Sequence, residues 1–260
     1  MPACGSKGRE GTTGEQAITQ MSKSRGNTVS RTLRKGTRFL WAKESPTHLE
    51  SIRLFELAFA RHAFPRGGAL LEIGAGTGWQ AHTLQAWGFA VDAIDLPTSN
   101  YRESRIFPVV DYDGHHIPFP DQTFDVVFSS NVLEHIPHVE AFQQEIHRVL
   151  KPGGVAVHIL PSSTWRFWTN ISHVLKSWKI PEIHGEHADN ALHEIALFRR
   201  RWWRQLFERT GWEIVAVKRC PLFYTGRSIM GQRIGIGARQ RLGRILGGST
   251  NLFVLRAART

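Results

Sequence analysis

"LEIGAGTGWQ", residues 71–80, follows an uncharged apolar stretch and holds three glycines at alternate positions. A glycine-rich turn from a strand into a helix brings backbone close to a ligand. A dinucleotide-binding turn needs its third glycine three residues after the second, and that position is Trp79. Glu72, two residues before the first glycine, would repel a pyrophosphate but attract a cation. The stretch therefore predicts a turn that holds a positively charged cofactor, and S-adenosylmethionine, with its sulfonium and ammonium groups, is such a cofactor.

Apolar runs alternate with helical patterns along the rest of the chain. Strands are expected at 69–74, 90–95, 124–130, 154–160, 212–220 and 250–258, with helices at 45–64, 79–88, 138–150 and 198–211. A weaker helix and strand are expected around residues 105–113. Strands separated by helices pair in parallel through right-handed crossovers. The order predicts an α/β fold, namely a Rossmann-like, doubly wound, mostly parallel seven-stranded sheet with an antiparallel C-terminal edge hairpin and a helical lid insertion.

The 260 residues, 41% of them hydrophobic, suffice for one sizeable core. We divide the chain into a disordered tail, residues 1–28, and one domain, residues 29–260. Within this domain, residues 68–160 are expected to bind the cofactor, 161–200 to form a lid over the acceptor, and 201–260 to form C-terminal strands joined by a basic connection.

Several features favour a cytoplasmic location. No apolar run reaches the roughly 20 residues that cross a bilayer, and the first residues do not resemble a secretory signal. Two cysteines, Cys4 and Cys220, are too few for a disulfide framework or a zinc site.

The net charge of +11 is unevenly distributed. Residues 1–160 hold equal numbers of basic and acidic side chains, so the whole excess lies in residues 161–260. This asymmetry suggests that the C-terminal part meets an acidic acceptor or surface, and a merely solvated basic face is the alternative.

Four stretches, taken in this order, resemble the class I S-adenosylmethionine-dependent methyltransferases, particularly the subgroup that contains ubiquinone-biosynthesis methyltransferases. They are "LLEIGAGTG", "VDAIDLP", "DYDGHHIPFPDQTFDVVFSSNVLEHI" and "EIHRVLKPGGVAVHILPS". The resemblance covers residues 68–160 well and the remainder only in strand order. It implies a ligand at the carboxyl ends of the strands.

The resemblance also implies which residues bind S-adenosylmethionine. They are Glu72, Gly74, Ala75, Gly76, Thr77, Gly78, Asp95, Leu96, Asp113, Gly114, Asn131 and Val132. Glu72 is an acidic partner for the ammonium group or the loop amides, Asp95 accepts the ribose hydroxyls, and Asp113 accepts the adenine amino group. Asp111 competes with Asp113 for this role, and Asp113 could instead simply cap a turn.

Two histidines are candidate bases for removing a hydroxyl proton, because imidazole titrates near neutral pH. His135 follows the fourth strand, and His187, or alternatively His184, lies in the predicted lid. The acids and histidines of residues 184–193 match no familiar metal-site spacing, so no metal is expected. Methyl transfer asks mainly for alignment and exclusion of water, so the sequence identifies the methyl donor better than the acceptor.

The acceptor is expected to be a small molecule, a saccharide or a lipid-linked compound, and an anionic group would suit the basic lid. The candidates for guiding such a group are Arg166, Arg199, Arg200 and Arg201, and a solvated helix face is the alternative for this run. Residues 227–248 mix isoleucine and leucine with arginine, which suggests peripheral contact with an anionic membrane or an ordinary covered connection. An RNA methyltransferase that uses the basic half is the alternative function. Nucleic acid is disfavoured because no RNA-binding module is recognisable, and a non-catalytic scaffold is disfavoured by the intact cofactor acids.

Overall fold

The computed structural model describes residues 46–178, 181–226 and 233–258. The strands are β1 (Gly68–Ile73), β2 (Phe89–Asp95), β3 (Val110–Asp111), β4 (Phe124–Ser130), β5 (Leu150–Pro161), β6 (Trp212–Cys220) and β7 (Thr250–Ala257). The α-helices are α2 (Pro46–Ala60), α3 (Trp79–Ala86), α4 (Val139–Val149), α5 (Ser163–Ser177), α6 (His193–Leu197), α7 (Arg200–Arg209) and α8 (Ile236–Leu246). Short 3-10 turns are η1 (Arg61–Ala63), η2 (Arg102–Ser104) and η3 (Leu133–His135).

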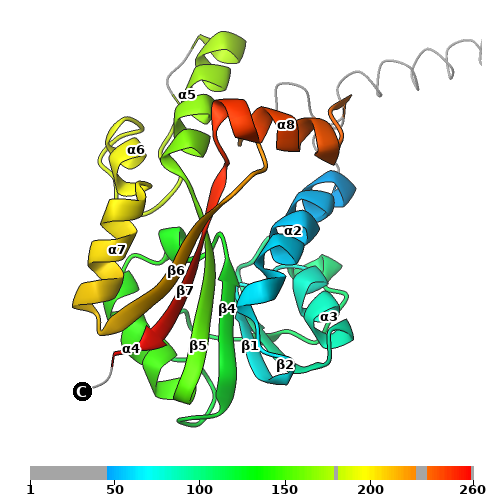
Figure 1. Cartoon of the computed structure of the whole chain (residues 1–260), viewed down its shortest axis with the longest axis vertical. Helices are drawn as coiled ribbons and strands as arrows, with labels where there is room; N and C mark the ends of the chain where they lie inside the picture. Colours follow the sequence, from blue (N-terminus) through cyan, green and yellow to red (C-terminus); the bar gives the residue numbers. More distant parts are fainter. Residues whose placement is uncertain (1–45, 179–180, 227–232, 259–260) are drawn as a thin grey trace, which may run out of the picture. The chain divides into compact units, whose positions relative to one another are not determined.

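The strands form one sheet in the order β3-β2-β1-β4-β5-β7-β6. Strands β1 to β5 run parallel, and β7 is antiparallel to both β5 and β6. Helices cover both faces of the sheet (Figure 1). The predicted doubly wound, mostly parallel seven-stranded sheet with an antiparallel C-terminal edge is therefore confirmed.

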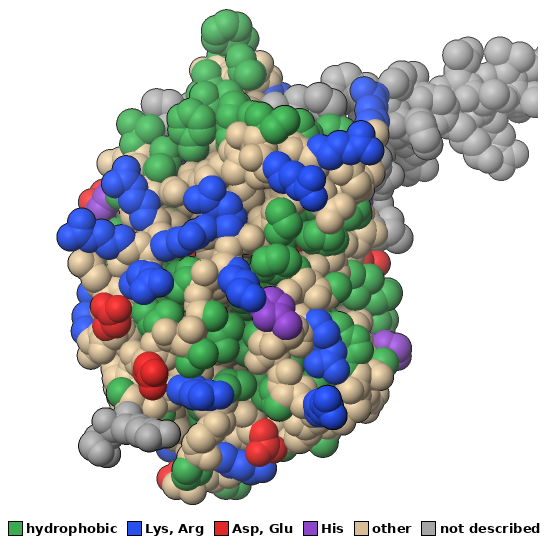
Figure 2. Space-filling model, in the orientation of Figure 1, with side chains coloured by type: hydrophobic (Ala, Val, Ile, Leu, Met, Phe, Trp, Pro, Cys, Tyr) green, Lys and Arg blue, Asp and Glu red, His purple; other side chains and the backbone are tan. Residues whose placement is uncertain are grey.

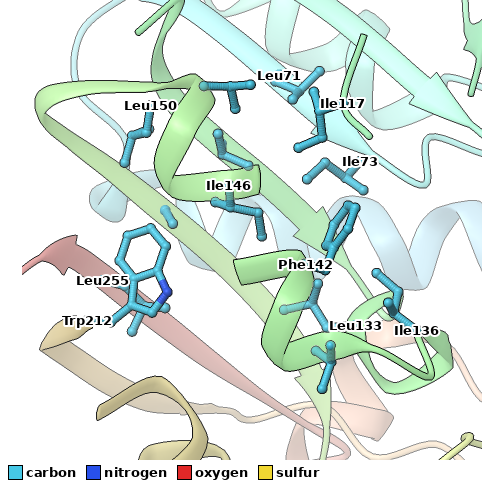
Figure 3. Packing of buried hydrophobic residues seen from close by; sticks show 14 of the residues in the cluster. Leu71, Ile73, Ile117, Leu133, Ile136, Phe142, Ile146, Leu150, Trp212 and Leu255 are labelled. Atoms are coloured by element: carbon cyan, nitrogen blue, oxygen red, sulfur yellow. The ribbon is translucent and has the colours of Figure 1, made fainter. Parts of the chain in front are cut away.

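Successive residues of a strand point to opposite faces, so the central strands are apolar on both. Leu70 packs in a cluster with Leu57 of α2 and Leu84 of α3. Its neighbour Leu71 packs on the other side, in a cluster that includes Phe142 of α4 (Figure 3). All four leucines are fully buried, and burying one such side chain contributes about 2 kcal/mol.

Helix α4 shows how the pattern produces this packing. Val139, Phe142, Ile146 and Val149 recur at helical spacing, and all four are buried. The opposite side of the helix carries most of the polar side chains of "VEAFQQEIHRV", whereas Gln143 is buried and accepts a hydrogen bond from Trp212. The helix therefore lies with one stripe on the sheet.

The third strand is shorter than expected. In the region around residues 105–113, where a weaker helix and strand were expected, only Val110 and Asp111 pair with β2, and the one helical turn nearby is η2. Pro97 lies between β2 and η2, and Pro108 lies two residues before β3; proline lacks the N–H that both helices and strands need. Ile106, in the same stretch, is 57% exposed.

The structure describes most of the predicted lid but none of the predicted tail. Helices α5 and α6 lie in the insertion between β5 and α7, whereas the predicted disordered tail, residues 1–28, lies outside the described residues. Residues 227–232 of the predicted basic connection also lie outside them, and its later part forms α8. In the part of the chain that the structure describes, no helix is both long and apolar enough to cross a membrane.

Candidate cofactor and acceptor site

The loop after β1 holds its three glycines in left-handed backbone conformations. Gly74, Gly76 and Gly78 have φ values of 70°, 57° and 81°. A Cβ on Gly74 would lie 2.3 Å from a methyl carbon of Val132, and one on Gly78 would lie 2.4 Å from Cβ of Phe107. Both conformation and close approach therefore require glycine at positions 74 and 78.

Backbone hydrogen bonds fasten this loop to its neighbours. The N–H groups of Gly74 and Ala75 both donate to the carbonyl of Ile94 at the end of β2, at 2.8 and 3.1 Å. The carbonyl of Thr77 accepts from the N–H of Ile106 at 2.8 Å. Ala75 and Thr77 thus hold the loop in shape through their main chains.

Glu72 lies at the end of β1 and is 1% exposed. Burial raises the pKa of its carboxyl to about 8, although a hydrogen bond from the Ala81 backbone opposes the rise. Its Oε2 has no hydrogen-bond partner among the described residues. A cationic group at this oxygen would favour the ionised form and supply the missing partner.

Asp95 is the last residue of β2, and backbone N–H groups hold both of its carboxylate oxygens in place. Its Oδ2 accepts from the N–H of Gly76 at 2.9 Å, and its Oδ1 accepts from the N–H of Leu96 at 2.8 Å. Each oxygen keeps a further lone pair, which suits acceptance from ribose hydroxyls. The Leu96 side chain reaches the next loop, where a Cβ on Gly114 would lie 3.0 Å from it.

Asp113 caps a turn in that next loop. Its Oδ1 accepts from the N–H groups of His115 and His116 at 2.7 Å each, and its Oδ2 lies 3.1 Å from Nδ1 of His116. These bonds hold the pKa of the Asp113 carboxyl well below its usual range. The turn-capping alternative is thus observed, and contact with an adenine amino group stays a prediction.

Asp111, the competing acid, is engaged in ion pairs. Its carboxylate lies 2.9 Å from Arg102 and 2.7 Å from Arg105. Hydrogen bonds from Arg105 and then Arg102 lower the pKa of Asp111. Its charge is therefore already neutralised, which favours Asp113 as the residue that faces a ligand.

The end of β4 meets the glycine loop. Asn131 adopts the left-handed region with φ of 56°, a conformation that asparagine tolerates better than most residues. Its N–H donates to the carbonyl of Ile159 at 2.8 Å. The chain then turns at Val132, whose methyl carbons adjoin Gly74, and enters η3. Residues 131–135 therefore connect the glycine loop to the segment that follows η3.

A pocket of about 760 Å³ lies between α5 and residues 181–184. Its walls combine the rings of Trp165, His173 and His184 with polar Ser177 and Glu182. A mixed aromatic and polar lining suits an organic acceptor that has both apolar surface and hydroxyl groups.

His135 connects η3 to this pocket. Its ring lies 4.6 Å from that of His184, at an angle of 71°, and the His184 ring lies 4.7 Å from Trp165. Burial lowers the pKa of both imidazoles, to about 3 for His184, so both are neutral at pH 7. His135 thus lies three residues after Val132 on one side and beside the pocket wall on the other.

His187, the other predicted base, lies elsewhere. It lines a separate small cavity together with Glu134, Trp202 and Trp203, and its ring is 5.6 Å from Trp202. Burial lowers its pKa. Among the described residues, His135 and not His187 therefore contacts His184 of the larger pocket.

The four arginines predicted to guide an anionic acceptor do not lie together on the surface. Arg166 is 2% exposed and pairs with buried Glu194, whereas Arg199 and Arg201 are exposed. Arg200 donates from Nε to Oδ1 of Asn251 at 2.8 Å. Sequence reasoning missed Glu194, because a lone acid far from Arg166 in the chain carries no recognisable signal.

The basic connection is also not uniformly exposed. Arg239 of α8 is 3% exposed and donates to the carbonyls of Ile234 and Phe223. Arg241 and Arg244 are exposed on the same helix. Lys and Arg side chains are spread over the face of the molecule seen in Figure 2. Arg239 therefore stabilises the fold, while Arg241 and Arg244 expose their charges to solvent.

Comparison with known proteins agrees with this geometry. A family model described as a methyltransferase domain matches residues 44–217. The ubiquinone biosynthesis O-methyltransferase of Paramagnetospirillum magneticum is 33% identical over 111 residues, 39% of this chain and 44% of that protein. The 2-methyl-6-phytyl-1,4-hydroquinone methyltransferase of Synechocystis is 35% identical over 102 residues, 36% of this chain and 32% of that protein. The chain thus spans less than half the length of these relatives.

A solved structure shares the fold at low sequence identity. The S-adenosylmethionine-dependent methyltransferase from Mesorhizobium loti superposes with a TM-score of 0.54 and 18% identity, covering 78% of this chain and 97% of that one. The described residues also fit the cofactor, because an unpartnered acid, a glycine loop and an oriented carboxylate meet at the ends of β1 and β2. The chain therefore belongs to the class I S-adenosylmethionine-dependent methyltransferases.

Proposed function

We propose that this chain transfers a methyl group from S-adenosylmethionine to a hydroxyl oxygen of a small molecule bound in the pocket between α5 and residues 181–184. One observation carries the proposal. The 3-10 turn η3 lies between the glycine loop and this pocket and borders both. Val132, just before the turn, adjoins Gly74, and His135, its last residue, contacts His184. A donor on one side and an acceptor on the other would meet at η3.

The chain's own residues would orient the reactants and exclude water. S-adenosylmethionine supplies a methyl group on a positively charged sulfur, which is already a good leaving group. The left-handed glycines 74, 76 and 78 give backbone access, Glu72 offers an unpartnered carboxylate oxygen to the ammonium group, and Asp95 presents oriented oxygens to the ribose. His135 is the residue proposed to assist loss of the acceptor's hydroxyl proton.

Within the broad class of small molecules, we favour a lipid-linked acceptor over a free saccharide. Helix α5, which forms one wall of the pocket, also carries exposed apolar side chains, namely Phe167, Ile171, Val174, Leu175 and the adjoining Trp178. The two relatives named above act, by their names, in ubiquinone biosynthesis and on a phytyl hydroquinone. A peripheral position at the cytoplasmic surface of an anionic membrane belongs to the same proposal, with exposed Arg241 and Arg244 near the lipid.

Calorimetric titration with S-adenosylmethionine, followed by a methyl-transfer assay read by mass spectrometry, tests the proposal. The acceptors are a prenylated hydroquinone, its tail-free analogue, a free saccharide and a short RNA. We expect saturable cofactor binding and methylation of the prenylated compound in preference to the others. Asp95→Asn should weaken cofactor binding, and Asp92→Asn, an exposed change on the same strand, is its control. A chain that does not bind the cofactor, or that methylates only RNA, contradicts the proposal.

A further inference from the structure

Three potential metal ligands from two distant segments meet at the wall of the pocket. Glu134 and His135 belong to η3, and His184 comes from the insertion. One carboxylate oxygen of Glu134 and one ring nitrogen of each histidine lie within 4.8 Å of one another, and Nε2 of His135 is 3.9 Å from Oε1 of Glu134. Ligands bound to one zinc ion at about 2.0–2.2 Å lie roughly 3–4 Å apart. Small side-chain rotations would therefore bring all three onto one ion.

The Glu134 carboxylate is buried without a hydrogen-bond partner on any other described residue, which indicates that a ligand is missing from the site. Its side chain is fully buried, and neither carboxylate oxygen has a hydrogen-bond partner on another residue in the part of the chain that the structure describes. The nearby Arg53 donates instead to Glu56, at 2.8 Å. A buried carboxylate without partners is costly, and bound cations are one common solution.

The backbone keeps the three ligands together. The carbonyl of Glu134 accepts from the N–H of Glu186 at 3.0 Å. Oε1 of buried Glu194 accepts from the N–H groups of His184 and Gly185 at 2.8 and 2.5 Å. A Cβ on Gly185 would lie 2.7 Å from the Glu134 carbonyl oxygen, so glycine permits this close approach. Such outer support is what orients metal ligands in proteins.

We propose that Glu134, His135 and His184 form a binding site for a divalent transition-metal cation of the zinc or manganese class. Two imidazoles and one carboxylate suit these ions better than Mg²⁺ or Ca²⁺, which prefer oxygen ligands throughout, and three protein ligands leave positions open. Because His184 lines the pocket, a cation held here would lie beside the space proposed for the acceptor, and His135 would then assist loss of the acceptor's hydroxyl proton as a ligand of the cation and not as a free base. The proposal that the cation binds does not depend on the proposed function, whereas its contact with the acceptor rests on that function.

This site departs from the sequence-based expectation that no metal is bound. That expectation considered the acids and histidines of residues 184–193 by their spacing. In the structure His184 is completed by η3, and Asp189 pairs with His193 at 3.0 Å. The ligand set could not be read from spacing, because its two segments meet only through the packing of the insertion.

Titration of the full chain with Co²⁺, prepared metal-free and without a histidine tag, tests the proposal. We expect one saturable site with the visible absorption bands of Co²⁺ bound to nitrogen and oxygen, and Zn²⁺ should displace it. His135→Ala and His184→Ala should each weaken binding at least about tenfold. His173→Ala, in the same pocket but outside the cluster, should leave binding unchanged.

Glu134→Gln keeps the shape of the buried side chain and should also weaken binding, with circular dichroism and thermal unfolding showing that each variant is folded. The proposal is overturned if no saturable binding occurs up to about 1 mM Co²⁺, or if His173→Ala weakens binding as much as His184→Ala. Calorimetry with S-adenosylmethionine on the same samples separates the two proposals. A chain that binds the cofactor but no cation refutes the metal site alone, and one that binds a cation but no cofactor refutes the proposed function alone.

Discussion

The Arg166 guanidinium and the Glu194 carboxylate form an ion pair closed to solvent. Nε of Arg166 lies 2.5 Å from Oε2 of Glu194, and the side chains are 2% and 1% exposed. Nη2 of Arg166 also donates to the carbonyl of Glu182, while Oε1 of Glu194 accepts from the N–H of His184. The pair therefore ties helices α5 and α6 to the segment that carries His184.

Arg166→Met should lower the free energy of unfolding by about 3–5 kcal/mol, because it leaves the Glu194 carboxylate buried without its counter-ion. Urea unfolding measures the change. Arg199→Met, at an exposed position, is the matched control and should alter stability by less than about 0.5 kcal/mol. Equal effects of the two substitutions would show that the pair adds nothing to stability.

Gly74→Ala should abolish or weaken S-adenosylmethionine binding at least about tenfold, because its Cβ would lie 2.3 Å from a methyl carbon of Val132 at a φ of 70°. Calorimetry measures the affinity, and circular dichroism checks the fold. Gly237→Ala is the control, since nothing lies within 4 Å of its added Cβ and alanine favours a helix. Normal cofactor affinity in the folded Gly74 variant would mean that the loop does not face the ligand.

Asp95→Asn should weaken S-adenosylmethionine binding by about 1–3 kcal/mol, because hydrogen bonds to a charged acceptor are stronger than those to a neutral amide. Calorimetric titration gives the difference. Asp92→Asn changes the same charge at an exposed site of β2 and should leave affinity unaltered. The ribose assignment fails if the two variants bind equally well.

Acid should destabilise the protein partly through His158. This side chain is fully buried, its Nδ1 lies 2.8 Å from the Ser129 hydroxyl, and burial lowers its pKa to about 3. Below about pH 6.5 the unfolded chain binds a proton that the folded chain refuses, so the stability present above that pH is lost as pH falls. Between pH 7 and 5 the loss from this group is about 2 kcal/mol.

Urea unfolding of the parent protein and of His158→Gln at pH 7 and 5 checks this sign. The variant should lose less stability on acidification, whatever its stability at pH 7. Gln85→Ala, an exposed change that removes no titratable group, should keep the parent's pH dependence. An unchanged slope in the His158 variant would show that this imidazole is not held neutral by the fold.

Arg199 and Arg201 remain the exposed candidates for guiding an anionic acceptor. Replacing both by Gln should raise the apparent KM severalfold at low salt and less at high salt, because screening removes long-range attraction. Steady-state kinetics at two ionic strengths measure this. If the two side chains are only solvated, KM and its salt dependence should match the parent.

The succession of strands along the chain and the position of the glycine-rich turn could be predicted from the sequence. Alternating apolar runs identified all seven strands, and the spacing of Gly74, Gly76 and Gly78 from Asp95 indicated where the ends of β1 and β2 would lie. These features are local, because each strand and turn follows from neighbouring residues and parallel strands end at the same edge. The third strand was overestimated because its pairing depends on an edge position.

The lining of the pocket proposed for the acceptor could not be predicted in this way. Arg166 was expected among surface charges, yet packing of α5 against α6 buries it with Glu194. His184 was one histidine among several in the insertion, and it meets Glu134 and His135 because backbone hydrogen bonds fold residues 184–186 onto η3. The physical reason is that such contacts join residues far apart in the chain, so they depend on how complete elements pack and leave no periodic trace in the sequence.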